Sequence, residues 1–299
     1  MGVRACGRKY LPGSIGVSNE VGVLYVVATP IGNLGDISSR AVDVLSTVDA
    51  ILAEDTRHST RLLNHLNIKT RILALHDHNE RAVVNRMVGR LEAGETMALI
   101  SDAGTPLISD PGYLLVRASR ERGIKVAPVP GASALLAALS VCGLSTAKFS
   151  FEGFLPAASG ARRSTLERLQ YEERTLVFFE APHRIVDCVR DAADIFGADR
   201  EAVVARELTK SFETILSGRL DELLATIVDD ENQRKGEFVL LVSGASDQDA
   251  SWANSRQTLE LLLAELPVKR AVALAAKITG EKKNRLYRAA LEMRGELDE

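Results

Sequence analysis

One regular alternation restricts the possible folds of this chain more than any other feature. From Leu24 to Val141, short apolar runs rich in β-branched residues alternate with amphipathic stretches of helical length. The strands that this pattern predicts are Leu24–Ala28, Ala50–Ala53, Arg71–Leu75, Thr96–Ile100 and Lys125–Pro128. The predicted helices are Ser38–Thr47, Thr60–Leu66, Glu80–Ala93, Gly112–Arg122 and Ala132–Val141. Such an alternation favours an α/β domain with a mostly parallel sheet covered on both faces.

The pattern changes near Lys148, where we place a domain boundary. Two neighbouring strands beyond it are joined through Lys210–Glu213, which suggests a hairpin, so we expect a mixed sheet here. The predicted strands are Phe149–Leu155, Leu176–Phe179, Ala202–Arg206, Glu213–Leu216 and Phe238–Val242. The predicted helices are Arg162–Tyr171, His183–Phe196 and Asp221–Val228.

A third region follows the second sheet. Ala245–Ala253 is rich in small polar residues and is predicted to be a linker. Three helical patterns follow it, at Thr258–Leu266, Val268–Thr279 and Lys282–Met293, and the Gly280 turn resembles that of a helix-turn-helix. We expect a flexible N-terminal tail over residues 1–21, an N-terminal α/β domain over 22–148, a C-terminal α/β domain over 149–245 and a helix-turn-helix-like extension over 254–299.

Composition argues against several classes of protein. The formal net charge is only −3, so a nucleic-acid partner requires a local basic patch, and Pro267–Arg288 is the segment where basic residues outnumber acidic ones. The cysteines, Cys6, Cys142 and Cys188, are far apart and odd in number, so we expect neither a disulfide scaffold nor a zinc site. No apolar run approaches the roughly 20 residues of a membrane helix. We expect a cytoplasmic protein with no membrane partner.

Three loops that contain glycine follow predicted strands. Thr29–Asp36 has the spacing Gly32-x-x-Gly35, which matches neither a dinucleotide fingerprint nor a P-loop. Ser101–Gly112 is long for a connection of this kind and holds two glycines, two prolines and two aspartates. Pro130–Ala134 opens a predicted helix. Because ligands of open α/β sheets lie outside the carboxyl ends of the strands, the second loop in particular is expected to shape a pocket.

Charged side chains also gather at strand ends, in Glu54–Arg57, His76–Asn79, Phe178–Arg184 and Arg206–Lys210. Solvated strand ends would account for each of them alone, but their repetition in both halves favours a functional cleft. The two histidines of His76–Asn79 stand at i and i+2, so on a strand they face opposite sides. No third ligand stands at a persuasive spacing, and we expect no metal.

Six segments, in order and without a large gap, resemble the family of ribosomal RNA small-subunit methyltransferase I, which has the tetrapyrrole methylase-like (class III) fold. They are Thr29–Asp36, Glu54–Arg57, Ser101–Pro106, Pro130–Ser133, Phe179–Arg184 and Arg206–Lys210. The resemblance runs from about Val23 to Gly244, and the helical tail is similar to the C-terminal extension of that family.

The resemblance implies transfer of a methyl group from S-adenosylmethionine to the ribose 2′-hydroxyl of a cytidine in the decoding region of 16S rRNA. It also implies that the cofactor lies in a cleft between the two α/β domains. The implied cofactor-binding residues are Pro30, Gly32, Asp102, Ala103, Gly104, Thr105, Ile108, Ser133, Ala134, Glu180, Ala181 and Leu208.

A ribose hydroxyl is a poor nucleophile, so a base or a charge stabiliser is expected to assist the transfer. The candidates are Lys210, Glu207 and Asp55, with His76 as a further one. The residues expected to contact RNA are Arg57, His76, Asn79, Arg184, Lys282, Lys283 and Arg285. The expected partner is 16S rRNA or the 30S subunit, and we expect a homodimer.

Three other functions stay open on the sequence. The first is a methyltransferase of the same fold that acts on a tetrapyrrole or a protein, although Thr105 stands where many tetrapyrrole enzymes carry aspartate. The second is a nicotinamide-dependent oxidoreductase, which the glycine spacing of the first loop disfavours. The third is an RNA-binding protein without catalysis, for which two loop-rich α/β domains exceed what binding alone requires.

Overall fold

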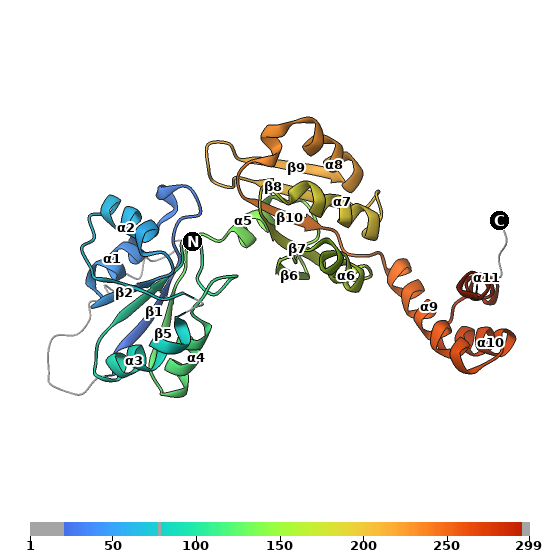
Figure 1. Ribbon diagram of the computed structural model, residues 1–299, viewed down its shortest axis with the longest axis horizontal. Coiled ribbons are helices and arrows are strands. Elements are labelled where there is room, and N and C mark those ends of the chain that lie inside the picture. Colours follow the sequence, from blue (N-terminus) through green and yellow to red (C-terminus); the bar gives the residue numbers. More distant parts are fainter. Residues whose placement is uncertain (1–20, 77–78, 295–299) are drawn as a thin grey trace, which may run out of the picture. The chain divides into compact units, whose positions relative to one another are not determined.

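A computed structural model describes residues 21–76 and 79–294 of the chain (Figure 1). The chain divides into two compact units. The first comprises residues 21–29 and 37–131, and the second comprises residues 30–36 and 132–294. No helix in the described part of the chain is both long enough and apolar enough to cross a membrane.

The first unit holds a sheet of five parallel strands, as the alternating pattern predicts. Its strands are β1 (Val23–Val27), β2 (Ala50–Ala53), β3 (Ile72–Ala74), β4 (Met97–Ile100) and β5 (Lys125–Val129). Their order in the sheet is β3-β2-β4-β1-β5. Every residue of β2 and β4 is buried, because helices cover both faces of the sheet.

The helices of the first unit divide between the two faces of this sheet. They are α1 (Ser39–Thr47), α2 (Thr56–His65), α3 (Glu80–Glu92) and α4 (Tyr113–Glu121). Leu45 of α1 and Leu63 of α2 pack in one core, and Leu91 of α3 and Leu115 of α4 pack in the other. The expected helix Thr60–Leu66 in fact begins at Thr56, because Asp55 caps its first turn.

The second unit holds the expected mixed sheet. Its strands are β6 (Phe149–Phe154), β7 (Thr175–Glu180), β8 (Glu201–Arg206), β9 (Thr214–Arg219) and β10 (Phe238–Val242), in the order β6-β7-β10-β8-β9. β6 and β7 are parallel, and the other pairs are antiparallel. The hairpin expected through Lys210–Glu213 joins β8 to β9.

One face of the second sheet is covered by α6 (Ser159–Leu169), α7 (Ile185–Phe196) and α8 (Leu220–Asp229). The other face packs against α5 (Ala134–Val141) and against Ile31, whose side chain is buried among Val177, Val203 and Leu241. A boundary at residue 148 would assign α5 to the first domain, whereas its apolar residues pack on the second sheet.

The C-terminal extension has its own small core. It consists of α9 (Asp247–Glu265), α10 (Val268–Thr279) and α11 (Lys283–Arg294). The linker expected over Ala245–Ala253 is wrong, since helix α9 begins at Asp247. Trp252 explains the difference, because its ring packs against the extension and lies 4.0 Å from the Arg285 guanidinium. Gly280 ends α10 in the left-handed conformation expected of a helix–glycine–helix turn.

Candidate active site

The strand order of the first unit creates a topological switch point. The connection from β1 runs toward β2, and the connection from β4 runs toward β5 on the opposite side. The carboxyl ends of β1 and β4 are neighbours, so the loops that leave them diverge at this point. In open α/β sheets this is the position at which a ligand binds.

Two backbone hydrogen bonds join the loops at the switch point. The Thr29 amide donates to the Gly104 carbonyl over 2.8 Å, and the Gly104 amide donates to the Thr29 carbonyl over 3.1 Å. The buried Thr29 hydroxyl donates to the Ser101 carbonyl over 3.2 Å. Gly104 has a φ of +83°, in the left-handed region that suits glycine. The predicted cofactor loop is therefore held by its backbone, with Gly104 at the contact.

The rest of this loop presents small and apolar groups to solvent. Ala103 and Ile108 are exposed, and Thr105 is half-buried. Leu107 and Ser109 adopt positive φ angles of 73° and 65°, which residues with a Cβ rarely do. Backbone held in sparsely populated conformations of this kind is typical of ligand-binding sites.

Asp102 and Asp55 connect the ends of β2 and β4. The Asp102 carboxylate accepts a hydrogen bond from the Asp55 amide over 3.1 Å. The Asp55 carboxylate accepts from the amides of Arg57, at 2.7 Å, and His58, at 3.2 Å, at the start of α2. These hydrogen bonds, first that from Arg57, lower the pKa of Asp55. A carboxylate with a lowered pKa is a weak base, which disfavours Asp55 as a general base. The hydrogen bonds that its carboxylate accepts from the first turn of α2 are those of a helix cap.

Asp55→Ala is expected to lower Tm by roughly 2–4 °C, because two amides of α2 lose their acceptor. Asp55→Asn retains a side-chain oxygen and is expected to keep both Tm and the rate of the methyl transfer that the resemblance implies. Asp43→Ala, which removes an exposed carboxylate from α1, serves as the matched control. A fall of more than about tenfold in the turnover of Asp55→Asn would instead make Asp55 a catalytic residue.

The residues expected after β3 are used within their own turn. The Asn79 side-chain oxygen accepts from the His76 amide over 2.9 Å, and its amide group donates to the Ala74 carbonyl over 3.2 Å. His76 is half-buried, whereas Arg57 is exposed at the start of α2. Residues 77 and 78, which complete the His76–Asn79 motif, lie outside the described residues. Of this group, Arg57 is the side chain best exposed for a contact with RNA.

In the second unit, segment 30–36 brings Gly32 to Lys210. A Cβ built on Gly32 would lie 2.3 Å from Cγ of Lys210, so the lysine stem lies directly against the glycine backbone. Pro30, two residues before Gly32 in the chain, is buried. The Lys210 Nζ donates to Glu207 Oε1 over 2.8 Å and to Glu237 Oε2 over 3.0 Å. We call Glu207, Lys210 and Glu237 the lysine cluster.

The lysine cluster closes around a second glycine. A Cβ on Gly236, which has a φ of +96°, would lie 2.4 Å from the carboxyl carbon of Glu207. Glu207 Oε1 also accepts from the Glu237 amide over 2.9 Å. Glu207 and Thr209 both have positive φ angles, 51° and 64°. The backbone is therefore strained at the two residues that flank the buried Leu208.

The two central charges of the lysine cluster stabilise each other. Partial burial favours a lower pKa for Lys210, but the hydrogen bonds to Glu207 and Glu237 outweigh it and raise the pKa. Burial favours a higher pKa for Glu207, but the bonds from Lys210 and from the Glu237 amide outweigh it and lower the pKa. Lys210 is therefore a protonated donor near neutral pH, which disfavours it as a general base and leaves it suited to stabilise negative charge.

Glu180 and Arg184 form an ion pair at the end of β7. The buried Glu180 carboxylate pairs with Arg184, whose Nε lies 3.1 Å from Oε1, and accepts from the Ala181 amide over 2.8 Å. Arg184 Nη2 also donates to the carbonyls of Leu155 and Pro156. Arg184 thus holds the loop after β6 to the end of β7, a structural use that leaves little of its side chain for RNA.

Ser133 and Ala134 begin α5. Both are half-buried, and the Ser133 hydroxyl makes no capping hydrogen bond at this helix N-terminus. In the extension, Lys282 and Lys283 are exposed, and their ammonium groups make no ion pair within the described residues. Arg285 is engaged, since its guanidinium bonds Glu281 over 3.0 Å and stacks on Trp252.

Two contributors escaped the sequence analysis. Thr29 was noticed only as the first residue of its loop, yet its backbone makes the bridge to Gly104. Glu237 precedes β10, and only the antiparallel register with β8 brings it to Glu207 and Lys210. Among the described residues no group of three or more potential metal ligands gathers in space.

Comparisons with known proteins show which family this chain resembles. The family of Tetrapyrrole (Corrin/Porphyrin) Methylases matches residues 23–224, and the RsmI C-terminal HTH domain matches residues 249–294. The chain is 58% identical to the ribosomal RNA small subunit methyltransferase I of Xylella fastidiosa (strain Temecula1), over 89% of this chain and 98% of that protein. It is 55% identical to the protein of the same name from Pseudomonas aeruginosa, over 92% and 99%.

The chain belongs to the ribosomal RNA small subunit methyltransferase I family, within the tetrapyrrole methylases. A solved cobalt precorrin-4 methyltransferase has the same fold, with a TM-score of 0.55 at 15% identity over 77% of this chain and 98% of that one. The expected tetrapyrrole methylase-like fold is thereby confirmed. As a member of the family, the protein is an S-adenosylmethionine-dependent methyltransferase.

The group after β4 fits this cofactor. Gly104 contributes no side chain at its contact with Thr29, and Ile108 offers exposed apolar surface for an adenosyl group. The small side chains of Ala103 and Thr105 leave the loop backbone accessible for hydrogen bonds. Of the residues predicted to bind the cofactor, these four are the ones that the geometry supports best.

Proposed function

We propose that this enzyme methylates the ribose 2′-hydroxyl of a cytidine in the decoding region of 16S rRNA. One observation carries the proposal: proteins named for small-subunit ribosomal RNA match nearly the whole chain at more than half identity. The extension, with its exposed Lys282 and Lys283, supports an acceptor that carries phosphates.

In this proposal the loop residues of the first unit hold the methyl donor. When bound, S-adenosylmethionine supplies a methyl group already activated by the sulfonium charge, so the protein mainly aligns the acceptor with it. Asp102 acts by fixing the Asp55 amide, which keeps the ends of β2 and β4 in register. The second-unit residues proposed for cofactor contact are Pro30, Gly32, Ser133, Ala134, Glu180, Ala181 and Leu208.

Lys210 is the residue that we propose to assist the transfer. Its ammonium has three donors, and two of them are used by Glu207 and Glu237. The third would donate to the acceptor oxygen and stabilise the negative charge that this oxygen gains as its proton leaves to solvent. The bond from that oxygen to the methyl carbon would form as the bond between the methyl carbon and sulfur breaks, with its electron pair left on sulfur. Glu207 acts by holding Lys210 in place and charged. Arg57, Lys282 and Lys283 are proposed to contact RNA phosphates.

We also propose that the enzyme is a homodimer and that it acts in the cytoplasm on the 30S subunit. Exposed apolar residues of α5 and β6, including Leu136 and Phe154, are compatible with a self-association surface. Sedimentation at micromolar concentration would give about twice the chain mass for the dimer and the chain mass itself for a monomer.

The test of the proposed function uses tritiated S-adenosylmethionine and 30S subunits that lack the modification. Label on the ribose of a cytidine, mapped by nuclease digestion and mass spectrometry, is the expected result. Label on another nucleotide or on a base would overturn the assigned position. Absence of label on 30S subunits and on free 16S rRNA, with cofactor binding retained, would overturn the RNA acceptor.

A further inference from the structure

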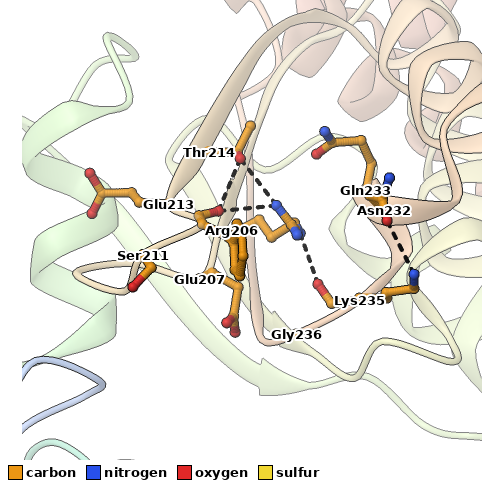
Figure 2. A pocket seen from close by; sticks show the side chains of 10 residues that line it. Arg206, Glu207, Ser211, Glu213, Thr214, Asn232, Gln233, Lys235 and Gly236 are labelled. Atoms are coloured by element: carbon orange, nitrogen blue, oxygen red, sulfur yellow. Dashed lines mark hydrogen bonds between the residues drawn. The ribbon is translucent and has the colours of Figure 1, made fainter.

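A cavity of about 750 Å³ opens beside the lysine cluster in the second unit (Figure 2). It lies between the loop that joins β8 to β9 and the segment that leads from the short helix η2 (Glu231–Arg234) into β10. Its volume is in the range of pockets that bind small molecules. Its walls are formed by Arg206, Glu207, Ser211, Phe212, Glu213, Thr214, Asn232, Gln233, Lys235 and Gly236.

The floor of the cavity is a buried guanidinium. Arg206 is only 8% exposed, and its Nε donates to the Lys235 carbonyl over 2.8 Å. Its Nη1 donates to the Phe212 carbonyl and to the Thr214 hydroxyl, both over 3.1 Å. Its Nη2 makes no hydrogen bond to any residue that the structure describes. Arg206 is thus fixed by its neighbours while one nitrogen keeps two donors for a ligand.

The opposite wall offers an acceptor. Gln233 Nε2 donates to Asp230 Oδ2 over 3.3 Å. Hydrogen bonds, first from the Asn232 amide, lower the pKa of Asp230, so this carboxylate is ionised and accepts only. The amide of Gln233 must therefore present its nitrogen to Asp230, which leaves the buried Oε1 without a partner within the described residues. An unpaired buried acceptor of this kind calls for a donor from a ligand.

The rim of the cavity carries an exposed aromatic ring. Phe212 is 72% exposed, at the tip of the hairpin. The two acidic residues of the wall are already engaged, since Glu207 pairs with Lys210 and Glu213 accepts from the Thr209 amide over 2.6 Å. Figure 2 shows the Glu213 side chain directed away from the Arg206 guanidinium, on the side opposite to Gln233. The cavity thus combines a stacking surface, a donor and an acceptor.

We propose that this cavity binds one unstacked nucleotide of the RNA, whose base is a cytosine. The ring stacks on Phe212, the exocyclic amine donates to Gln233 Oε1, and the neighbouring ring nitrogen N3 accepts from Arg206 Nη2. Uracil places an oxygen where cytosine has its amine, so Gln233 repels it. The inference rests on the proposed function for RNA as the substrate, and it adds the residues that select the base.

The test measures binding, without methyl transfer. Fluorescent single-stranded RNA hexamers, one with a single cytidine among uridines and one of uridines alone, are titrated with the full chain and followed by anisotropy. We expect the wild type to prefer the cytidine hexamer by about 5- to 100-fold, as base readout typically gives. Phe212→Ala is expected to weaken binding by about 5- to 100-fold, the usual contribution of one stacked base, and Phe212→Trp to retain it.

Paired variants separate base recognition from folding. Gln233→Leu removes the acceptor and is expected to abolish the preference for cytidine. Tyr171→Ala removes another exposed ring of the second unit, just after α6, and is expected to change nothing, and S-adenosylmethionine binding by calorimetry shows that each variant is folded.

Three results would overturn the site: equal affinity of Phe212→Ala and wild type, a preference that survives Gln233→Leu, or no wild-type preference. Labelling of 30S subunits by the wild type in the same preparation would show that the proposed function stands even where the cavity fails.

Discussion

Replacement of Gly104 by valine is expected to raise the Kd for S-adenosylmethionine by at least about 100-fold while the fold remains intact. At a φ of +83° a β-branched residue is an outlier that costs on the order of 1–3 kcal/mol. Distortion of the loop also endangers the two hydrogen bonds with Thr29, each with a net contribution of about 0.5–1.5 kcal/mol. Together these terms amount to about 2–6 kcal/mol, a range that includes the roughly 2.8 kcal/mol that corresponds to 100-fold.

Gly123→Val is the matched control for this prediction. Gly123 has a similar φ of +72° after α4 and no atom within 4 Å of the position of a Cβ. Its substitution carries the same kind of backbone strain in the same unit without altering the loop after β4. Calorimetric titration with the cofactor, next to thermal melting of both variants, separates affinity from stability. A Gly104→Val enzyme that binds within threefold of wild type would show that this loop does not hold the cofactor.

Lys210→Met is expected to reduce the rate of methyl transfer by about 100-fold or more, the usual effect of removing one donor that stabilises developing charge. The substitution also leaves Glu207 facing Glu237 without the ammonium that now lies between them. Binding of S-adenosylmethionine is expected to change little. Lys125→Met, at an exposed position of β5, is the control. Single-turnover kinetics that match wild type would exclude Lys210 from the chemical step.

The same substitution has a defined pH dependence. The raised pKa of Lys210 gives stability that is complete below its unfolded pKa of about 10.4 and is lost as pH rises through the folded value. The lowered pKa of Glu207 gives stability that is present above its unfolded pKa of about 4.3 and is lost as pH falls through the folded value. The difference in unfolding free energy between wild type and Lys210→Met should therefore be largest near neutral pH. A difference that stays constant from acid to alkali would contradict this coupling.

The sequence predicted the strands well, because burial on both faces leaves an unbroken apolar run. β2 and β4 are examples, with no exposed residue in either. It was less informative where a side chain acts through geometry. The sequence predicts Asp55 as a catalytic carboxylate and does not indicate that its oxygens cap α2. The small polar residues before Trp252 were predicted to be a linker, yet they form α9.

The candidate site was predictable only in part for the same reason. Residues that lie close together in the sequence at a strand end, such as Glu207 and Lys210, could be predicted as candidates. Glu237 did not, because its contact with them depends on the register of β10 against β8, which no local pattern specifies. Gly236 likewise acquires its role only from the side chain that Glu207 lays across it.

Ile31 has a consequence for biosynthesis. This residue leaves the ribosome more than a hundred residues before its partners Val177, Val203 and Leu241, so its packing site is complete only when β10 has been made. Burial of its side chain is worth about 1.5–3 kcal/mol, which the growing chain gains only at that late stage. Expression of residues 132–299 alone would omit this side chain altogether. No contiguous fragment therefore contains the whole second unit without the first. A permuted chain that joins residues 30–36 to residues 132–299 is the smaller version to make.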